Sequence, residues 1–144
     1  AGPATRLVGV SESTWLALQK GDGFVVGPAG KKAKLELPGV AACLVENEQV
    51  LVASEAGGAA TLTLTKTATG EAQGSASLKA SRVQLFPSRT GRLVAVVHDA
   101  GCDVLDVSQM KTKRFPVKGL NGVGFSRDEK HVLLAARKLE RRPL

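Results

Sequence analysis

Aromatic residues are scarce in this sequence. Phe and Trp make up 3% of the 144 residues, and Tyr is absent. A core must therefore be built from Val, Leu and Ala, and the 43% hydrophobic content is enough for one, which argues against a disordered chain. The scarcity also argues against a sequence-reading RNA module, because such modules stack bases on aromatic side chains.

Cysteines and long apolar runs are equally rare. Cys43 and Cys102 form no C-x-x-C unit, so a zinc site is not expected. We expect both to be small buried hydrophobic residues in a reducing, cytoplasmic compartment, and a disulfide between them stays open as an alternative. No stretch approaches the ~18 apolar residues of a membrane span, so we expect no membrane partner.

What the chain does contain is a repeated sequence pattern. Residues 83–97 read VQLFPSRTGRLVAVV, and residues 123–136 read VGFSRDEKHVLLAA. A weaker copy, ACLVENEQVLVAS, lies at residues 42–54. Phe125 follows Phe86 by about 39 residues, and Phe86 follows Leu44 by about 42, which is within the range of propeller blade repeats.

Strand signals dominate between these copies. Short alternating or apolar runs are separated by Gly, Pro and Asp turns, and no convincing long helix appears. In Thr61–Thr65 (TLTLT) the period of two predicts Leu62 and Leu64 on one face of a strand and the threonines on the other. We therefore predict an all-β chain of about three to four antiparallel blades.

The predicted blades have definite boundaries. They are residues 1–40, 41–80, 81–121 and a partial unit at 122–136, followed by a basic tail at 137–144. A closed propeller usually needs 4–8 blades. We therefore expect a partial, WD40-like propeller that is a fragment of a longer protein, with an open array of sheets or a ring completed by another chain as the alternatives.

The third unit carries the WD40-like pattern. An apolar-Phe-Pro-Ser turn at Leu85–Leu93 is followed by a strand with an apolar-Asp-apolar unit at Val104–Ser108. The blades resemble degenerate WD40 repeats, although the Trp-Asp and Gly-His pairs are missing. The polar Asp–His–Ser/Thr–Trp network of many WD40 blades therefore does not carry over to this chain.

Within that group, the order of elements is similar to the N-terminal propeller of the eukaryotic translation initiation factor 2A family. The similar segments are Leu7–Val10 with Trp15–Leu18, the strand at Leu105–Ser108, and the turn at Phe125–Glu129. The b subunit of initiation factor 3 has a similar propeller. The resemblance implies a cytoplasmic, non-catalytic binding platform in translation initiation, with the small ribosomal subunit, RNA or other factors as partners. A generic WD40-like protein–protein scaffold is the alternative.

The net charge of +7 directs attention to basic clusters. A basic domain is compatible with RNA or an anionic partner surface, and the alternative is that these residues only keep the protein in solution. We expect the first cluster in a turn between strands, projecting from one rim. The candidate binding residues are Lys111, Lys113, Arg114, Arg137, Lys138, Arg141, Arg142, Lys31 and Lys32.

Catalytic and cofactor chemistry have little support in the sequence. His98 and Cys102 are close along the chain, but Asp99–Gly101 is typical of a hairpin turn between two strands. His131 has no second ligand at metal-binding spacing, and Gly21–Gly23 is not followed by the Gly-Lys-Ser/Thr of a phosphate loop. We predict no enzyme activity and no cofactor.

Overall fold

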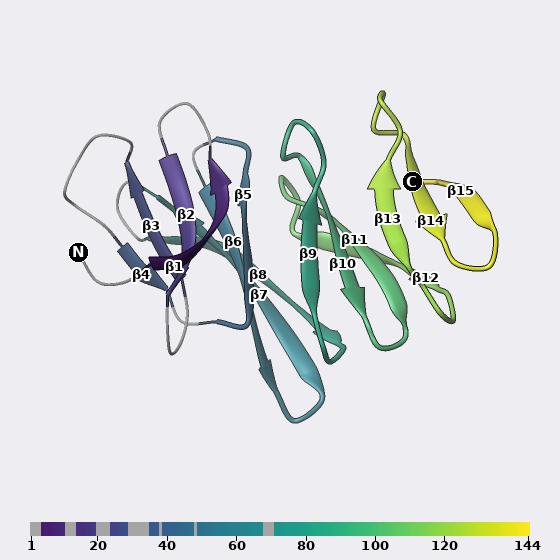
Figure 1. Cartoon of the computed structure of the whole chain (residues 1–144), viewed down its shortest axis with the longest axis horizontal. Coiled ribbons are helices and arrows are strands. Elements are labelled where there is room, and N and C mark those ends of the chain that lie inside the picture. Colours follow the sequence, from purple (N-terminus) through teal and green to yellow (C-terminus); the bar gives the residue numbers. More distant parts are fainter. Residues whose placement is uncertain are drawn as a thin grey trace.

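In the computed structural model of the chain, the described ranges contain fifteen β-strands in four antiparallel sheets and no helix (Figure 1). The structure describes residues 4–10, 14–19, 24–28, 35–37, 39–47, 49–67 and 71–144. Side chains are described from residue 39 onward within these ranges.

Each sheet is a meander in which strand order follows chain order. The first sheet contains β1 (Ala4–Val10), β2 (Thr14–Gln19), β3 (Phe24–Pro28) and β4 (Leu35–Leu37). The second contains β5 (Ala41–Val45), β6 (Gln49–Ala56), β7 (Ala59–Lys66) and β8 (Ala72–Lys79). The third contains β9 (Gln84–Pro87), β10 (Leu93–His98), β11 (Gly101–Asp106) and β12 (Lys111–Pro116). The fourth contains β13 (Gly122–Phe125), β14 (His131–Ala135) and β15 (Leu139–Pro143).

The predicted all-β fold of successive antiparallel blades is confirmed by these sheets. The alternation in TLTLT is present as far as Leu64. Leu62 and Leu64 lie in the hydrophobic cluster shared with the third sheet, whereas Thr61 is exposed and Thr63 is half-buried. Thr65 is buried as well, at a register shift between β7 and β8. The division of the chain at residues 40, 80 and 121 stays a prediction.

The C-terminal residues differ from the expectation of a basic tail at 137–144. Strand β15 pairs with β14 in register, from Ala135 opposite Leu139 to His131 opposite Pro143. The physical reason is that a backbone ladder needs no apolar side chains, and charged residues are common on a sheet edge that faces solvent. The fourth sheet therefore extends to residue 143.

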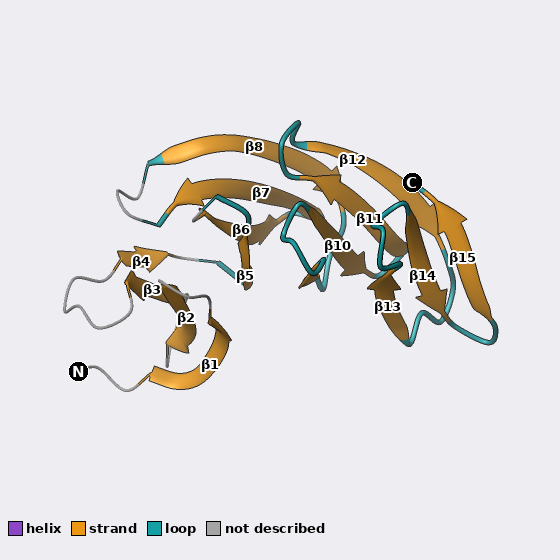
Figure 2. Cartoon of the chain, turned by 90° about the horizontal axis from the view of Figure 1, so that it is seen from above, coloured by secondary structure: helices purple, strands orange, loops and turns teal. Residues whose placement is uncertain are grey.

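The sheets follow one another in an arc, as Figure 2 shows. Strands β8, β12 and β15 lie along the outer side of the arc, while β5 and β13 lie on its inner side. The first strand of a sheet is therefore the inner one. The turns that leave the inner strands of successive sheets consequently lie close together.

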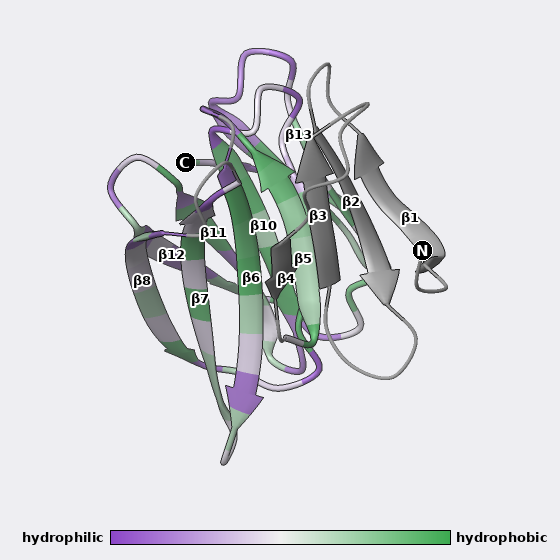
Figure 3. Ribbon diagram, turned by 90° about the vertical axis from the view of Figure 1, so that its left-hand side faces the viewer, coloured by the Kyte–Doolittle hydropathy of each residue, from purple (hydrophilic) through white to green (hydrophobic). Residues whose placement is uncertain are grey.

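Two hydrophobic clusters hold neighbouring sheets together. The cluster between the second and third sheets includes Leu51, Leu62 and Leu105, all fully buried. The cluster between the third and fourth sheets includes Val132 and Leu134. Each buried Leu or Val contributes about 1.5–3 kcal/mol relative to an exposed one. Figure 3 shows the hydropathy of the residues along the chain, with β6 and β10 hydrophobic over much of their length and loops largely hydrophilic.

Candidate binding surface at the blade turns

The basic residues of the third sheet lie in a strand, not in the turn that the sequence suggested. Strand β12 begins at Lys111, which already pairs with Asp106. The chain reverses earlier because Asp106 Oδ1 accepts the Ser108 and Gln109 amides at 3.0 and 3.3 Å. This compact Asp-centred turn leaves Lys111, as well as the two basic residues that follow, in the β12 ladder.

Arg114 belongs to a polar network around the buried Asp103 carboxylate. Its Nε donates to Asp103 Oδ1 at 2.8 Å, and its Nη2 donates to the Lys79 carbonyl of the second sheet at 2.7 Å. His98 Nδ1 accepts the Ala100 amide at 3.1 Å, which assigns the hydrogen to Nε2 for the 2.8 Å bond to Asp103 Oδ1. Arg114 therefore links the third sheet to the second.

Lys113 makes the opposite connection. Its Nζ donates to the Pro143 carbonyl of the fourth sheet at 3.2 Å and lies 5.4 Å from the centre of the Phe115 ring. Lys113 and Arg114 thus point from the two faces of β12 to the two neighbouring sheets. Their positive charges are partly committed to holding the blades together.

The C-terminal basic residues have different surroundings. Arg142 pairs with Glu140 at 2.9 Å, and Arg141 Nη2 lies 3.3 Å from His131 Nδ1. Arg137 and Lys138 are exposed beside the β14–β15 turn, and no ion pair to either occurs within the described part of the chain.

The described members of the predicted set lie on the two faces of β12 and on the fourth sheet, and Lys113 reaches the residue next to Arg142. Their role in binding stays a prediction. Lys31 and Lys32 lie outside the described residues.

The residues considered for nucleophilic catalysis lie on opposite faces of the third sheet. Cys102 packs in the cluster with the fourth sheet, whereas His98 bonds to Asp103 on the face toward the second sheet. Burial, followed by the charge of Asp103, raises the pKa of Cys102 to about 12, and burial raises that of Cys43 to about 12. Both cysteines are free and buried, which confirms the expected packing role, and they lie in different clusters, so no disulfide joins them in this structure. Among the described residues, no cluster of three metal-ligating side chains occurs.

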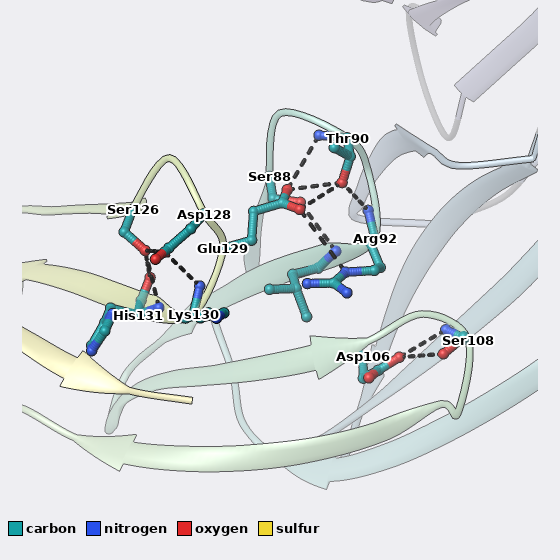
Figure 4. A network of polar contacts seen from close by, with 11 residues as sticks. Ser88, Thr90, Arg92, Asp106, Ser108, Ser126, Asp128, Glu129, Lys130 and His131 are labelled. Atoms are coloured by element: carbon teal, nitrogen blue, oxygen red, sulfur yellow. Dashed lines mark hydrogen bonds and ion pairs between the residues drawn. The ribbon is translucent and has the colours of Figure 1, made fainter.

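The repeated sequence produces two matching turns, shown in Figure 4. In the β9–β10 turn (residues 88–92), the Leu93 amide donates to Ser88 Oγ at 3.1 Å. In the β13–β14 turn (residues 126–130), the His131 amide donates to Ser126 Oγ at the same distance. The Ser88 and Ser126 amides donate back to the carbonyls of Leu93 and His131 at 2.8 and 3.0 Å. The serine of each repeat therefore closes its turn.

Both turns contain a residue in the left-handed region that contacts the preceding turn. Gly91 has φ +76°, and its carbonyl accepts the Glu46 amide at 3.2 Å. Glu129 has φ +58°, and both of its carboxylate oxygens lie 2.8 Å from the Thr90 hydroxyl. The turns of the second, third and fourth sheets are thereby joined into one continuous surface.

Hydrogen bonds within these turns stabilise the ionised form of their two carboxylates. Burial alone would raise the pKa of Glu129, but hydrogen bonds from Ser88 and Thr90 and the charge of Arg92 outweigh it and lower the pKa below its usual value. The Ser126 hydroxyl and the Lys130 amide likewise lower the pKa of Asp128. Both carboxylates are therefore ionised at neutral pH and engaged within the turns.

A cavity of about 270 Å³ lies between the inner strands β9 and β13. We call it the inner cavity. Phe86, which is 43% exposed, pairs with Ala95 and so lies on the sheet face toward β13, while Val123 and Phe125 pack from the other side. The two turns complete the lining with the exposed residues Arg89 and Arg127. The cavity thus has apolar walls with a cationic residue from each repeat.

Sequence reasoning did not include this site. The available signal was the Ser-Arg pair that follows Phe86-Pro87 in one repeat and Phe125 in the next. That pair places an arginine at the same position in neighbouring blades. The bond between Glu129 and Thr90 joins residues 39 apart in the sequence and has no local pattern.

Comparison with known proteins identifies the architecture. No protein-family model and no curated protein sequence matches the chain. Among solved structures, Hsv2p of Kluyveromyces lactis superposes over 99% of this chain with a TM-score of 0.68 at 16% identity. The Cps50 (Swd1) β-propeller domain of Myceliophteria thermophila superposes over 92% with a TM-score of 0.63 at 13% identity. The fold is that of a β-propeller. Hydrazine synthase of Kuenenia stuttgartiensis also matches, over 87% of the chain with a TM-score of 0.60 at 13% identity.

The chain spans only part of each matched structure. The chain covers 50%, 54% and 47% of the three matched structures, which is about half of their length. Identities of this size show the fold alone. In the part of the chain that the structure describes, there is no helix with the length and hydropathy needed to cross a membrane.

Proposed function

We propose that this chain is a non-catalytic binding platform that recognises protein partners. The observation that carries this proposal is the continuous surface formed by the turns of successive blades. Loops positioned by a rigid scaffold are common recognition sites. Here three turns from separate sheets contact one another through Gly91 and Glu129, so residues far apart in the sequence can act as one surface.

The roles of the polar residues support a platform over an enzyme. A propeller fold alone does not decide, since hydrazine synthase is among the matched structures. Asp103 bonds to His98 within the third sheet and to Arg114, which reaches the second sheet, and Cys102 is a buried thiol on the other face. A nucleophile needs a base within hydrogen-bond reach, and this arrangement separates the two groups.

The experiment is affinity purification of partners followed by reassembly from purified components. The platform proposal predicts at least one protein that binds the isolated chain directly and in fixed stoichiometry. A chain that binds no purified candidate, while turning over a substrate in an activity screen, would refute the proposal.

A narrower proposal places the platform in translation initiation, in contact with the small ribosomal subunit or RNA. It is supported by the resemblance described above, the net charge of +7, and the exposure of Lys111, Arg137 and Lys138. Phosphate contacts by such side chains are strongly salt-dependent. We expect sedimentation with purified small ribosomal subunits that weakens steeply as salt increases.

A matched pair of charge reversals sharpens this test. Arg137→Glu with Lys138→Glu changes exposed residues and should weaken sedimentation, whereas Glu140→Lys should strengthen it or leave it unchanged. Absence of sedimentation at low salt would remove the ribosomal assignment and leave the protein-binding platform intact.

A further inference from the structure

We propose that the inner cavity binds an acidic peptide segment of a partner protein. In this proposal an apolar side chain of the peptide enters between Phe86 and Phe125, and flanking carboxylates pair with Arg89 and Arg127. The inference rests on the platform function proposed above and identifies the site and the chemistry of its ligand.

The two arginines are available for a ligand. Both are exposed, and no described carboxylate pairs with either guanidinium. The nearby acids are already engaged, because Asp128 accepts the Ser126 hydroxyl at 2.7 Å and Glu129 accepts the Thr90 hydroxyl. Guanidinium groups form two parallel hydrogen bonds with a carboxylate, which makes them selective for such a ligand.

The size of the cavity limits what can enter. Its volume of about 270 Å³ is just below the ~300 Å³ at which pockets for drug-sized ligands begin. That space accommodates one apolar side chain and adjoining backbone, and it is too small for a large cofactor. The walls suit such a side chain because Phe86, Val123 and Phe125 are apolar.

A peptide fits these observations better than single-stranded RNA. RNA-binding platforms present aromatic faces on which successive bases stack. Phe125 packs against the cluster between the third and fourth sheets, so Phe86 is the only aromatic side chain of the cavity lining that is exposed. One exposed ring and two arginines beside a small cavity match an apolar residue with acidic neighbours.

The experiment begins with selection from a phage-displayed library of random linear peptides. The bait is the whole chain, and the most enriched peptide is synthesised with fluorescein for anisotropy. We expect enriched peptides to carry Asp or Glu next to Leu, Ile, Met or Phe. We expect Arg89→Ala with Arg127→Ala to weaken the binding of that probe by about tenfold or more.

Two further variants test the geometry. Phe86→Ala removes an exposed ring from the cavity and should weaken the probe without unfolding the chain. Lys66→Ala with Lys118→Ala removes the same charge from exposed residues at the end of β7 and in the β12–β13 turn, which do not line the cavity. It should leave the affinity within about twofold because screened surface charges act weakly at a distance. Circular dichroism and thermal unfolding confirm that each variant is folded.

The results separate this proposal from the platform function. Enriched peptides without acidic residues, or affinities equally affected by both double variants, would overturn the inner-cavity proposal. A single-stranded RNA oligonucleotide that binds through Arg89 and Arg127 when no peptide is enriched would also overturn it. Purified protein partners that bind the Phe86→Ala variant and the Arg89→Ala, Arg127→Ala variant with normal affinity would overturn the inner-cavity proposal. The platform function would then remain, through another surface.

Discussion

At the inner end of the junction between the second and third sheets, two backbones touch, whereas at the next junction two side chains meet. Gly91 brings its carbonyl to the Glu46 amide, and Glu129 reaches Thr90 with its carboxylate. The two residues occupy the same position in matching turns, and both have positive φ. One repeat geometry is therefore compatible with close packing or with a polar bridge, depending on a single residue.

The outer ends of the two junctions differ in a similar way. Arg114 reaches back to the Lys79 carbonyl and is held by Asp103, which is 3% exposed. Lys113 reaches forward to the Pro143 carbonyl with no described carboxylate beside it. Both inter-sheet bonds are exposed, but only Arg114 is also oriented by a buried carboxylate, and such charge-assisted bonds contribute more than isolated exposed ones. The junction between the second and third sheets (the first junction) should therefore tolerate substitution less than the junction between the third and fourth sheets (the second junction). The following changes test that difference.

The largest effect is expected for Gly91→Ala. A Cβ at this position would lie 2.6 Å from the Glu46 nitrogen and 2.9 Å from the Val45 backbone. The clash adds to the cost of left-handed φ for a non-glycine residue, so we expect a loss of about 3–4 kcal/mol in the free energy of unfolding. Urea denaturation monitored by circular dichroism measures it.

Gly119→Ala is the matched control for that change. Gly119 has φ +68°, but a Cβ there would meet nothing within 4 Å. We expect only the conformational cost, about 1–2 kcal/mol. Equal losses of unfolding free energy in the two variants would show that the contact between the β5–β6 and β9–β10 turns is not tight.

Next in size is Asp103→Ala in the first junction. The substitution removes the buried acceptor of His98 Nε2 and Arg114 Nε, both at 2.8 Å. We expect a loss of about 2–3 kcal/mol, below the usual cost of breaking a buried ion pair because Arg114 is partly exposed. Asp103→Asn keeps one oxygen acceptor and should lose less. An Asp103→Ala variant as stable as the parent chain would mean that the network does not hold the two sheets together.

Strand identity was predictable because it depends on local alternation. The Leu-Thr alternation of Thr61–Leu64 and the Asp99–Gly101 hairpin are both present as expected, with His98 opposite Gly101. Such patterns involve residues two positions apart, so the sequence displays them directly. Strand β15 was missed because its sequence, LERRP, has no apolar alternation, and pairing with β14 supplies its backbone contacts.

The contacts between blades were not predictable in the same way. Arg114 and Lys79 are 35 residues apart, and Thr90 and Glu129 are 39 apart. No periodicity links such residues, because their proximity depends on how whole sheets stack. Basic residues were consequently assigned to a ligand surface, while two of them, Lys113 and Arg114, connect sheets.

A smaller effect is expected at the second junction from a series at Glu129. Glu129→Ala removes the hydrogen bonds to Thr90 and should cost about 1–2 kcal/mol. Glu129→Gly loses the same bonds but relieves the positive φ, so it should be less destabilising by about 1 kcal/mol. A double-mutant cycle with Thr90→Val measures the coupling. Glu129→Ala and Glu129→Gly of equal stability would contradict the strained turn.

Acid should remove the contribution of Glu129. Because its pKa is lowered in the folded protein, its stabilisation is present above the unfolded-state pKa of about 4.3 and disappears as pH falls through the lower folded value. We expect Glu129→Gln to be less stable than the parent chain at neutral pH and to approach it in acid. A gap that widens as pH decreases would contradict this assignment.

The smallest effect is expected for Lys113→Met, which breaks the outer contact of the second junction. Its bond to the Pro143 carbonyl is exposed, so the loss should be below about 0.5 kcal/mol. Arg114→Met, next to it on β12, should cost about 1 kcal/mol or more because it leaves the buried Asp103 carboxylate without its guanidinium. Thermal unfolding of the pair gives the comparison. If Lys113→Met were more destabilising than Arg114→Met, the contact of β12 with the fourth sheet would contribute more than its contact with the second sheet, contrary to the order expected here.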